Sequence, residues 1–377
     1  MHVAIVTETY PPEVNGVALT IERLERGLVE AGHRVSLVRP RQHGELPVAP
    51  RATELVVQGA PLPRYPELRF GFPAGRRLRQ RWGDDRPDAV YVATEGPLGW
   101  SALRAARGLG IPAAAGFHTR FDDYMRRYGL PFLAPLALGW MRRFHNRAQG
   151  TLVPTRELAE FLATQGFERL HQLGRAVDCS VFDPQRRDPL LRREWGVDES
   201  ALAVVHVGRL AAEKNLPLLV QTFRAIQTKR PEARLVLVGD GPERGRLQKA
   251  HPDFIFAGVH RGESLGRQVA SADLFLFPSL SETFGNVTLE AMAAGLPLVA
   301  FDYGAAREVV RHGESGWLAD REDAEAFIAG ALQLAADAEL RQRIGSAART
   351  AMLDSDPAAL SRRFADLLAN LPHPETR

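Results

Sequence analysis

The sequence has a single cysteine among its 377 residues. Cys179 therefore has no partner for an intrachain disulfide, and a zinc cluster built on cysteines is excluded. The sequence also lacks any run of the roughly 18–20 uncharged apolar residues that a membrane-spanning helix needs. Its first residues, MHVAIVTETYPP, show neither the basic segment nor the cleavage site of a secretory leader. We expect a cytoplasmic protein in a reducing compartment.

Lysine is absent from residues 1–170, where 23 arginines stand against 17 acidic residues. Residues 171–377 instead carry 28 acidic against 25 basic residues, which brings the whole chain to a net charge of +3. A basic first half suits an anionic partner such as a phosphorylated ligand or a membrane surface. Arginines spread over a solvated surface are the alternative. The arginines are not interleaved with aromatic residues on one face, so we expect no nucleic-acid partner.

Short apolar runs alternate with amphipathic helical patterns along the chain. This alternation indicates parallel sheets covered by helices on both faces. In the first half the predicted strands are 2–10, 35–38, 88–93 and 111–118, and the predicted helices are 18–32 and 99–109. In the second half the predicted strands are 203–210, 234–242, 272–279 and 296–302, and the predicted helices are 216–231, 286–294 and one from about 322.

The fold class is therefore α/β, with two Rossmann-like, doubly wound domains. We place the first domain at residues 1–175 and the second at 176–356, and expect a final helix, about 357–377, to pack back on the first. The polar, proline-containing segment 183–196 is a candidate hinge. Ligands of such sheets bind beyond the carboxyl ends of the strands, so the default site is a cleft between the two domains.

Neither half carries G-x-G-x-x-G after its first strand, which weakens the case for a nicotinamide-dependent dehydrogenase. Phosphate binding has other candidates. Gly16 stands just before the first helix, where backbone N–H groups can approach an anion, although an ordinary turn is the alternative. Arg209 and Lys214 follow the first strand of the second half, and a guanidinium with a mobile ammonium suits a diphosphate. Solvated surface charges are the alternative there.

The stretch SETFGNVTLEAMAAGLP, residues 281–297, places Glu282 in a loop and Glu290 inside a helix that begins near Asn286. Gly295 and Pro297 end this helix. The N–H groups of residues 284–287 can hold a phosphate, with Glu290 on a ribose and Glu282 on a sugar. A capping acid and a buried helix acid are the alternative.

Four stretches together resemble the retaining glycosyltransferases of family 4. They are the Glu282/Glu290 pair, the loop GRLAAEKN, the VGDGP turn at 238–242 and the opening TYPPEVNGVA. AVDCSVFDP (176–184) is similar to the family's stretch at the domain junction. FHTRFDDYMRRYG (117–129) with ETFGNVTLEAM resembles the branch of mannosyl-, sulfoquinovosyl- and related glycolipid-forming transferases. The resemblance covers nearly the whole chain and implies the GT-B architecture, two Rossmann-like domains facing each other across a cleft.

The resemblance also implies roles for single residues. Glu290 would bind the nucleotide ribose, and Glu282 would bind the hydroxyls of the donor sugar. Arg209 and Lys214 would hold the diphosphate. His118 would lie beside the anomeric carbon and contact the donor sugar and the acceptor. Further donor contacts would come from Asn15, Gly16, Val259, His260, Thr283, Phe284, Gly285, Asn286 and Val287, and acceptor contacts from Asp123 and Tyr124.

Two positions depart from the family pattern. Asn15 precedes Gly16 where many relatives have a second glycine, and Thr283 stands where many have glycine. Neither change removes a phosphate donor, yet both can alter the choice of donor. The resemblance implies no metal and no other cofactor, because Arg209, Lys214 and a helix N-terminus can stabilise the leaving diphosphate. The acceptor would attack on the face from which the nucleotide leaves, with Glu282 as a positioning residue.

Residues 124–148 couple a short apolar run to Arg126, Arg127, Arg142 and Arg143. Tryptophan and arginine beside an apolar surface suit the interface of an anionic bilayer, so we predict a peripheral enzyme on the inner face of the plasma membrane. A buried helix with a solvated basic end is the alternative.

The predicted function is retaining, metal-independent transfer of a hexose to a hydroxyl of a lipid-linked or glycan acceptor. GDP-mannose is the first donor hypothesis, and a UDP-hexose is the alternative. A nucleotide-sugar epimerase would need acids and histidines placed for proton removal at a sugar carbon, which we do not find. A non-catalytic binder would hold the donor without turning it over. The side chains of the predicted site do not distinguish a donor nucleotide with guanine from one with uracil.

Overall fold

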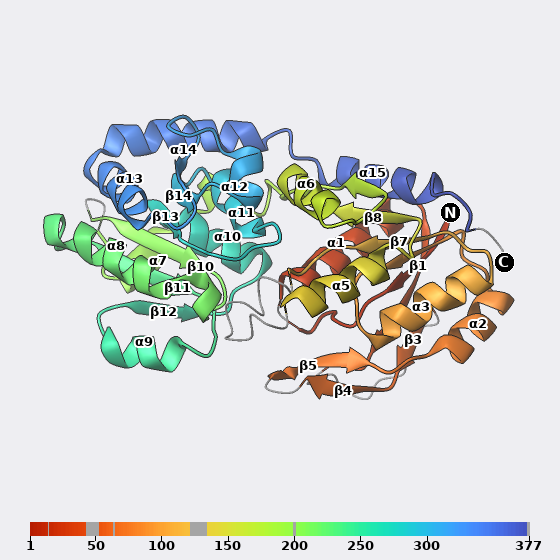
Figure 1. Cartoon of the computed structure of the whole chain (residues 1–377). Helices are drawn as coiled ribbons and strands as arrows, with labels where there is room; N and C mark the ends of the chain where they lie inside the picture. The colour runs from red at the N-terminus through yellow and green to blue at the C-terminus, as the bar shows by residue number, and fades with distance from the viewer. Residues whose placement is uncertain (14, 43–52, 63–64, 121–133, 199–200, 375–377) are drawn as a thin grey trace. The chain divides into compact units, whose positions relative to one another are not determined.

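The computed structural model describes residues 1–13, 15–42, 53–62, 65–120, 134–198 and 201–374 (Figure 1). The described residues form two compact units. The first contains those up to Arg175 together with those from Pro357 onwards, and the second runs from Ala176 to Asp356.

The first unit is built on a seven-stranded parallel sheet with the strand order β3-β2-β1-β6-β7-β8-β9. The order reverses between β1 and β6, so the loops that follow these two strands flank a topological switch point. The strands are β1 (His2–Val6), β2 (Arg34–Pro40), β3 (Glu54–Val57), β6 (Ala89–Val92), β7 (Ala113–Gly116), β8 (Gly150–Val153) and β9 (Leu170–Gln172). A separate antiparallel hairpin joins β4 (Gly59–Leu62) to β5 (Tyr65–Gly71).

Helices cover both faces of this sheet, and alternate residues of β1 enter two different cores. Val3 and Ile5 pack towards α1 and α15, whereas Ala4 and Val6 pack towards α2, α3 and α5. Burial on both faces explains why this strand reads as a continuous apolar run. The helices are α1 (Gly16–Glu30), α2 (Gly75–Asp84), α3 (Pro97–Gly108), α5 (Ala134–His145), α6 (Arg156–Thr164) and α15 (Pro357–Ala369).

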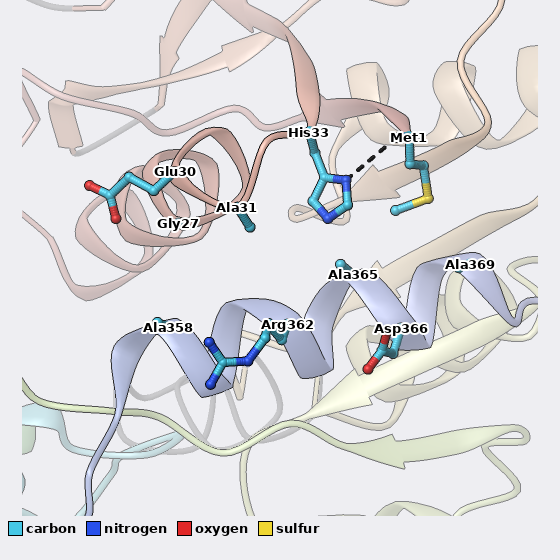
Figure 2. A pocket seen from close by; sticks show the side chains of 10 residues that line it. All are labelled: Met1, Gly27, Glu30, Ala31, His33, Ala358, Arg362, Ala365, Asp366 and Ala369. Atoms are coloured by element: carbon cyan, nitrogen blue, oxygen red, sulfur yellow. Dashed lines mark hydrogen bonds between the residues drawn. The ribbon is translucent and has the colours of Figure 1, made fainter.

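The C-terminal helix α15 packs on α1 within the first unit. The contact is close because residue 27 is glycine: a Cβ there would lie 1.9 Å from Ser361 Oγ. A groove of about 450 Å³ remains beside the two helices (Figure 2). Met1 and His33, which line it, lie at the amino ends of β1 and β2. Ligands of doubly wound sheets bind at the carboxyl ends, so the groove is not the expected ligand site.

The second unit is built on a six-stranded parallel sheet with the order β12-β11-β10-β13-β14-β15. The order reverses between β10 and β13, which places a second switch point there. The strands are β10 (Ala203–Val207), β11 (Arg234–Val238), β12 (Ile255–Gly258), β13 (Leu274–Phe277), β14 (Leu298–Phe301) and β15 (Trp317–Ala319). The sequence prediction of two doubly wound α/β domains is confirmed.

Two core clusters, one on each face of this sheet, hold the helices of the second unit. The helices are α7 (Pro189–Glu194), α8 (Leu216–Lys229), α9 (Arg244–Ala250), α10 (Gly262–Ala270), α11 (Asn286–Ala293), α12 (Gly304–Val309), α13 (Ala324–Ala336) and α14 (Ala338–Met352). Two short 3₁₀ helices are η2 (Pro184–Arg186) and η3 (Ala212–Lys214).

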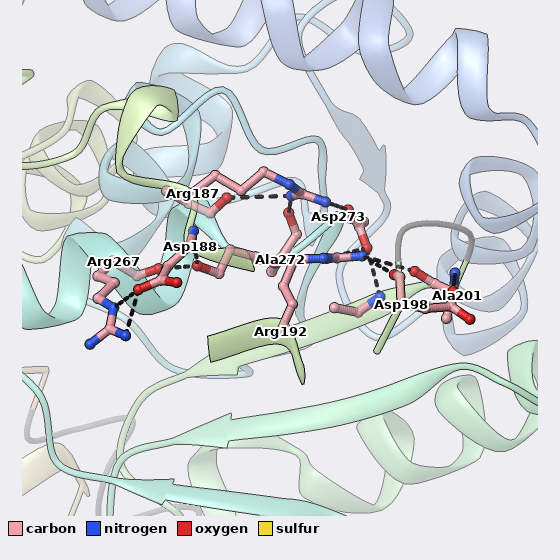
Figure 3. Close-up of polar contacts among 11 residues, drawn as sticks. Arg187, Asp188, Arg192, Asp198, Ala201, Arg267, Ala272 and Asp273 are labelled. Atoms are coloured by element: carbon pink, nitrogen blue, oxygen red, sulfur yellow. Dashed lines mark hydrogen bonds and ion pairs between the residues drawn. The ribbon is translucent and has the colours of Figure 1, made fainter. Parts of the chain in front are cut away.

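The candidate hinge at 183–196 is folded into the second unit as η2 and α7 (Figure 3). Arg192 is buried and donates to the carbonyl of Ser271 (2.8 Å) and to Asp273 Oδ2 (3.0 Å). Arg187 donates to the other oxygen of the same carboxylate (2.6 Å). The segment is thereby fastened to the amino end of β13. The segment belongs wholly to the second unit, since the division falls at residues 175/176, so the hinge prediction is wrong.

Candidate functional site

The switch point of the second unit brings together Lys214, on η3 after β10, and Glu282, in the loop after β13. Their side chains form an ion pair and are only 13% and 15% exposed. Ser279 Oγ donates a second hydrogen bond to Glu282 Oε1 (2.7 Å). A cation and a carboxylate are therefore held side by side at the carboxyl edge of the sheet, where ligands of this topology bind.

A stack of side chains lies beneath Lys214. The Lys214 ammonium lies 5.6 Å from the centre of the Phe277 ring, and His206 stacks on that ring at 6.2 Å. His206 Nδ1 lies 3.0 Å from the carbonyl of Leu276, so Nδ1 carries the proton and Nε2 is an acceptor. Burial lowers the pKa of His206 to about 4, with Lys214 acting in the same direction. The histidine is therefore neutral and adds no second positive charge beneath Lys214.

Hydrogen bonds to main-chain atoms hold the loop that carries Glu282 in place. Leu280 N donates to the carbonyl of Glu213 (2.9 Å), the residue before Lys214. From the other side, Tyr303 Oη donates to the carbonyl of Ser279 (2.7 Å), and Arg321 Nη2 donates to that of Leu280 (2.7 Å). Because these hydrogen bonds already fix the loop, a ligand that binds here loses little affinity to the conformational entropy of ordering it.

Helix α11 begins at Asn286, as predicted, three residues after Thr283. Its N-cap, Gly285, is left-handed (φ 98°) and has no side chain with which to cap the first turn. The N–H groups at this helix start and the helix dipole favour an anion. Glu290 lies inside the helix and is buried, at 6% exposure. Phe284 and Gly304 pack together here, since a Cβ at Gly304 would lie 2.8 Å from the carbonyl of Phe284.

The switch point of the first unit differs, because a carboxylate of the protein occupies the corresponding helix start. Glu8 follows β1, and its Oε1 accepts a hydrogen bond from Leu98 N (2.9 Å) in the first turn of α3. Gly96 makes room for it: a Cβ there would lie 2.0 Å from Glu8 Oε2. Burial raises the pKa of Glu8 to about 7, with Glu95 acting weakly in the same direction. An anionic ligand is therefore better accommodated at α11 than at α3.

The VGDGP turn supports the loop that carries Arg209. A Cβ at Gly239 would lie 1.9 Å from the carbonyl oxygen of Gly208, and Gly239 has φ +139°. Leu210 N donates to the carbonyl of Asp240 (2.9 Å), and Gly239 N donates to that of Gly258 (2.7 Å). Close backbone packing thus requires glycine at residue 239, next to the loop that carries the half-buried Arg209.

Val259 and His260 follow β12, and Val259 is 50% exposed. The His260 ring contacts Ser264 Oγ through Nδ1 (2.6 Å) and the carbonyl of Ala257 through Nε2 (3.0 Å). Both ring nitrogens of His260 are thus engaged inside the protein. Only the backbone of Val259 and His260 is then left to contact a nucleotide base. A base contact here stays a prediction.

His118 follows β7 in the first unit, and each of its ring nitrogens has a polar partner. Tyr91 Oη lies 2.7 Å from Nε2, and Arg175 Nη2 lies 3.1 Å from Nδ1. A guanidinium can only donate, so Nδ1 accepts and the proton of the neutral ring sits on Nε2. Burial lowers the pKa of His118 well below its ordinary value, helped by the charge of Arg175 and by His145. His118 is therefore a neutral, oriented group. Gly116 packs against it, since a Cβ there would lie 2.5 Å from Nε2.

At the start of α1, the Asn15 side chain is the N-cap and accepts from Ala18 N (2.8 Å). A Cβ at Gly16 would meet no protein atom within 4 Å. No internal contact therefore requires glycine at this position, which fits a place that a ligand approaches.

Protein-family comparison matches residues 14–181 to Glycosyltransferase Family 4 and residues 201–337 to Glycosyl transferases group 1. A GDP-mannose-dependent alpha-mannosyltransferase of Mycolicibacterium smegmatis is 37% identical, covering 94% of this chain and 93% of its own. The chain belongs to glycosyltransferase family 4.

This glycosyltransferase is also similar to a second curated protein and to a solved structure. The sulfoquinovosyl transferase SQD2 of Arabidopsis thaliana is 33% identical, covering 77% of this chain and 58% of its own. HepE of Anabaena, solved in complex with UDP, matches with a TM-score of 0.77 at 20% identity, covering 98% of this chain and 100% of that one. At that identity the match shows the fold alone, and the fold is GT-B.

The structure of this glycosyltransferase thus joins Lys214 to Glu282 and sets both near the sequence that opens α11. His118, Asn15 and Gly16 belong to the first unit, and Asp123 and Tyr124 lie outside the described residues. Three residues of the site were not predicted from the sequence: Ser279, which contacts Glu282, and Tyr91 and Arg175, which contact His118. A serine at the end of a predicted strand was the one local signal among them.

Within the described residues, no group of three or more His, Cys, Asp or Glu side chains is arranged to hold a metal ion. The one Asp-x-Asp sequence of the chain, Asp354 and Asp356, is exposed beyond the end of α14. Among the helices of the described residues, none is both long enough and apolar enough to cross a bilayer.

Proposed function

We propose that this glycosyltransferase moves mannose from GDP-mannose to an acceptor hydroxyl, with retention at the anomeric carbon. The observation that carries the proposal is the Lys214–Glu282 pair at a switch point, beside a helix whose N-cap is a glycine. The choice of donor is supported by the mycobacterial mannosyltransferase, which is 37% identical over 94% of the chain. A lipid-linked hydroxyl is the first acceptor hypothesis, and a glycan is the second.

In the proposed reaction the bond between the anomeric carbon and the β-phosphate oxygen breaks as the acceptor oxygen bonds to that carbon from the same face. The acceptor proton passes to the departing diphosphate, so the atoms balance without a separate base. Lys214, Arg209 and the N–H groups at the start of α11 stabilise the negative charge that develops on the diphosphate. In this proposal the two cations and the helix start do the stabilising, without a metal ion.

The two glutamates have separate proposed roles. Glu290 is buried in α11 and accepts hydrogen bonds from the ribose hydroxyls, which every nucleoside diphosphate sugar carries. Glu282 accepts from hydroxyls of the sugar, where its contacts with Lys214 and Ser279 hold the carboxylate in place. His118 is neutral and donates through Nε2 towards Tyr91, so its proposed role is to position the acceptor and not to remove its proton.

The proposal is tested with GDP-mannose, GDP-glucose, UDP-glucose and UDP-galactose in metal-free buffer. Thermal shift and donor hydrolysis are measured for the wild type and for Glu290→Gln. We expect GDP-mannose to raise the melting temperature most and to be hydrolysed, and both effects to be weaker in the variant. Binding of UDP-sugars without binding of GDP-sugars would show that the donor nucleotide carries uracil and not guanine. Absence of any sugar-nucleotide effect would overturn it.

A further inference from the structure

Strand β12 of the second unit is irregular at its carboxyl end. Phe256 pairs with Leu237 of β11. The next residue of β11, Val238, pairs with Gly258, so Ala257 is an extra residue in β12. Such a bulge bends the strand and re-aims the residues that follow it. Gly258 then turns the chain with a left-handed φ of +79°.

The residues on either side of Val259 are held by different parts of the second unit. Before it, the carbonyl of Gly258 accepts from Gly239 N (2.7 Å), in the VGDGP turn. After it, the ring of His260 is fastened to the first turn of α10. Val259 itself is 50% exposed, and in the described part of the chain neither its N–H nor its carbonyl takes part in a hydrogen bond. The main-chain groups of Val259 are therefore fixed in place and open to a ligand.

The contacts of the His260 ring determine which of its nitrogens carries a proton. Nε2 lies 3.0 Å from the carbonyl of Ala257, which can only accept, so Nε2 carries a proton and donates the hydrogen bond. In the neutral ring Nδ1 is then the acceptor, and the Ser264 hydroxyl donates to it across 2.6 Å. Gln268, buried on the same helix as Ser264, lies 3.3 Å from Nε2. The ring thus ties the extra residue of the bulge to α10.

Val259 lies at the same edge of the sheet as the proposed diphosphate site. β12 is the outermost strand of the second sheet, two strands away from β10 (Figure 1). Lys214 follows β10 and Val259 follows β12, so both lie at the carboxyl ends of parallel strands. Two strand spacings amount to roughly 10 Å. A nucleoside diphosphate that extends along this edge from Lys214 therefore brings its base to Val259.

We propose that His260 and Ser264 are positioning residues that set which nucleotide base this glycosyltransferase accepts. Together with the bulge at Ala257 they fix the height and direction at which Val259 presents its N–H and carbonyl. Guanine and uracil carry their donors and acceptors at different spacings, so the placement of these main-chain groups decides between them. The inference rests on the proposed function, which supplies the nucleotide, and it adds the residues that select its base.

Calorimetric titrations of GDP, UDP and pyrophosphate in metal-free buffer test this role. Pyrophosphate has no base, so it reports on the diphosphate site alone. Ser264→Ala removes the hydroxyl at an exposed position, and Ser264→Thr keeps it. His260→Leu removes both ring contacts, whereas the amide of His260→Gln can still donate to the carbonyl of Ala257. The matched control is Ser346→Ala, the same change at an exposed position of α14.

We expect the wild type to bind GDP at least about tenfold more tightly than UDP. This ratio should fall about tenfold in His260→Leu and about fivefold in Ser264→Ala, because the hydrogen bonds that orient the loop are lost. Ser264→Thr, His260→Gln and Ser346→Ala should keep the ratio within about twofold of wild type. Pyrophosphate should bind all of these proteins with equal affinity, since Lys214 is untouched.

The outcomes separate the base-selecting role from a merely structural one and from the proposed function. An unchanged ratio of GDP to UDP affinity in Ser264→Ala and His260→Leu would overturn the inference. So would a pyrophosphate affinity that falls together with the ratio, because a ring that only stabilised the unit would weaken every ligand alike. Both results leave the proposed function standing, since the wild type still binds GDP. A wild type that binds neither nucleotide would contradict the proposed function itself.

Discussion

The ammonium of Lys214 lies against the carboxylate of Glu282, and this ion pair joins the loops that follow β10 and β13. Within the protein each charge offsets the other. In the proposed reaction a donor diphosphate would compete with Glu282 for Lys214, whereas the sugar hydroxyls would need Glu282 itself. Binding of the nucleotide and transfer of the sugar are therefore separable by one substitution.

Glu282→Gln keeps the size of the side chain and removes its charge. We expect GDP to bind as tightly as to wild type or more tightly, because Lys214 is released from its ion pair. Transfer of mannose should fall about 10²–10³-fold, the usual cost of losing one such stabilising contact. Calorimetry measures the first effect and initial rates the second. Glu194→Gln, at an exposed position on α7, is the control. Weaker GDP binding in proportion to the lost rate would contradict the separate roles.

Gly239→Ala tests the backbone packing beneath the Arg209 loop. The added Cβ would lie 1.9 Å from the carbonyl oxygen of Gly208, at a residue with φ +139°. We expect a loss of roughly 2–4 kcal/mol in the stability of the second unit. Gly245→Ala is the matched control, because a Cβ there meets nothing within 4 Å and residue 245 lies in α9. It should gain about 0.5–1 kcal/mol. Denaturant unfolding of both variants decides, and equal effects would refute the account.

Glu8 predicts a pH dependence of stability. Its pKa is raised by burial from 4.5 to about 7, so between these values the folded state holds a proton that the unfolded state has released. Stability contributed by this group is present below pH 4.5, falls as pH rises through the window and stays lost above pH 7, by about 3 kcal/mol in all. In Glu8→Gln this decline should disappear, because the amide does not titrate, while its oxygen can still accept the hydrogen bond from Leu98 N. Unfolding of the two proteins at pH 5 and pH 8 measures the difference. A constant difference would contradict the prediction.

Arg175 is expected to set the protonation state of His118. It donates to Nδ1 and lowers the pKa of His118, second in effect to burial. In Arg175→Met the pKa of His118 should rise, and the ring should lose its preference for a proton on Nε2. Nitrogen NMR of the imidazole, assigned with His118→Gln, reports both changes. Arg175→Lys restores the charge without the planar fork and should recover the pKa more than the tautomer. An unchanged spectrum in Arg175→Met would refute the role.

The strands were predictable because parallel strands buried on both faces read as apolar runs. Their ends were overestimated where the chain stays buried after leaving the sheet. The first strand was predicted as 2–10 and ends at Val6, yet Thr7 and Tyr10 remain buried. The strand 203–210 ends at Val207 for the same reason, since Leu210 is wholly buried. The sheet strands β3, β8, β9, β12 and β15, each of three or four residues, were missed because so few residues carry little periodic signal. The hairpin of β4 and β5 was missed as well.

The candidate site was predictable in its parts and not in its contacts. The start of α11 and the glycine at its end follow from local signals. The Lys214–Glu282 contact spans 68 residues and depends on β10 pairing with β13 instead of a strand nearer in sequence. Tyr91 and Arg175 reach His118 from 27 and 57 residues away. Contacts of that range depend on strand order, which one sequence does not specify.

The central claim is that the second unit binds a nucleoside diphosphate through Lys214. Calorimetric titration of GDP into the wild type, Lys214→Met and Lys229→Met tests it most directly, since Lys229 is an exposed lysine at the end of α8. We predict binding to the wild type and to Lys229→Met with the same affinity, and at least about tenfold weaker binding to Lys214→Met. Equal affinity for all three proteins, or no binding of GDP or UDP to the wild type, would contradict it.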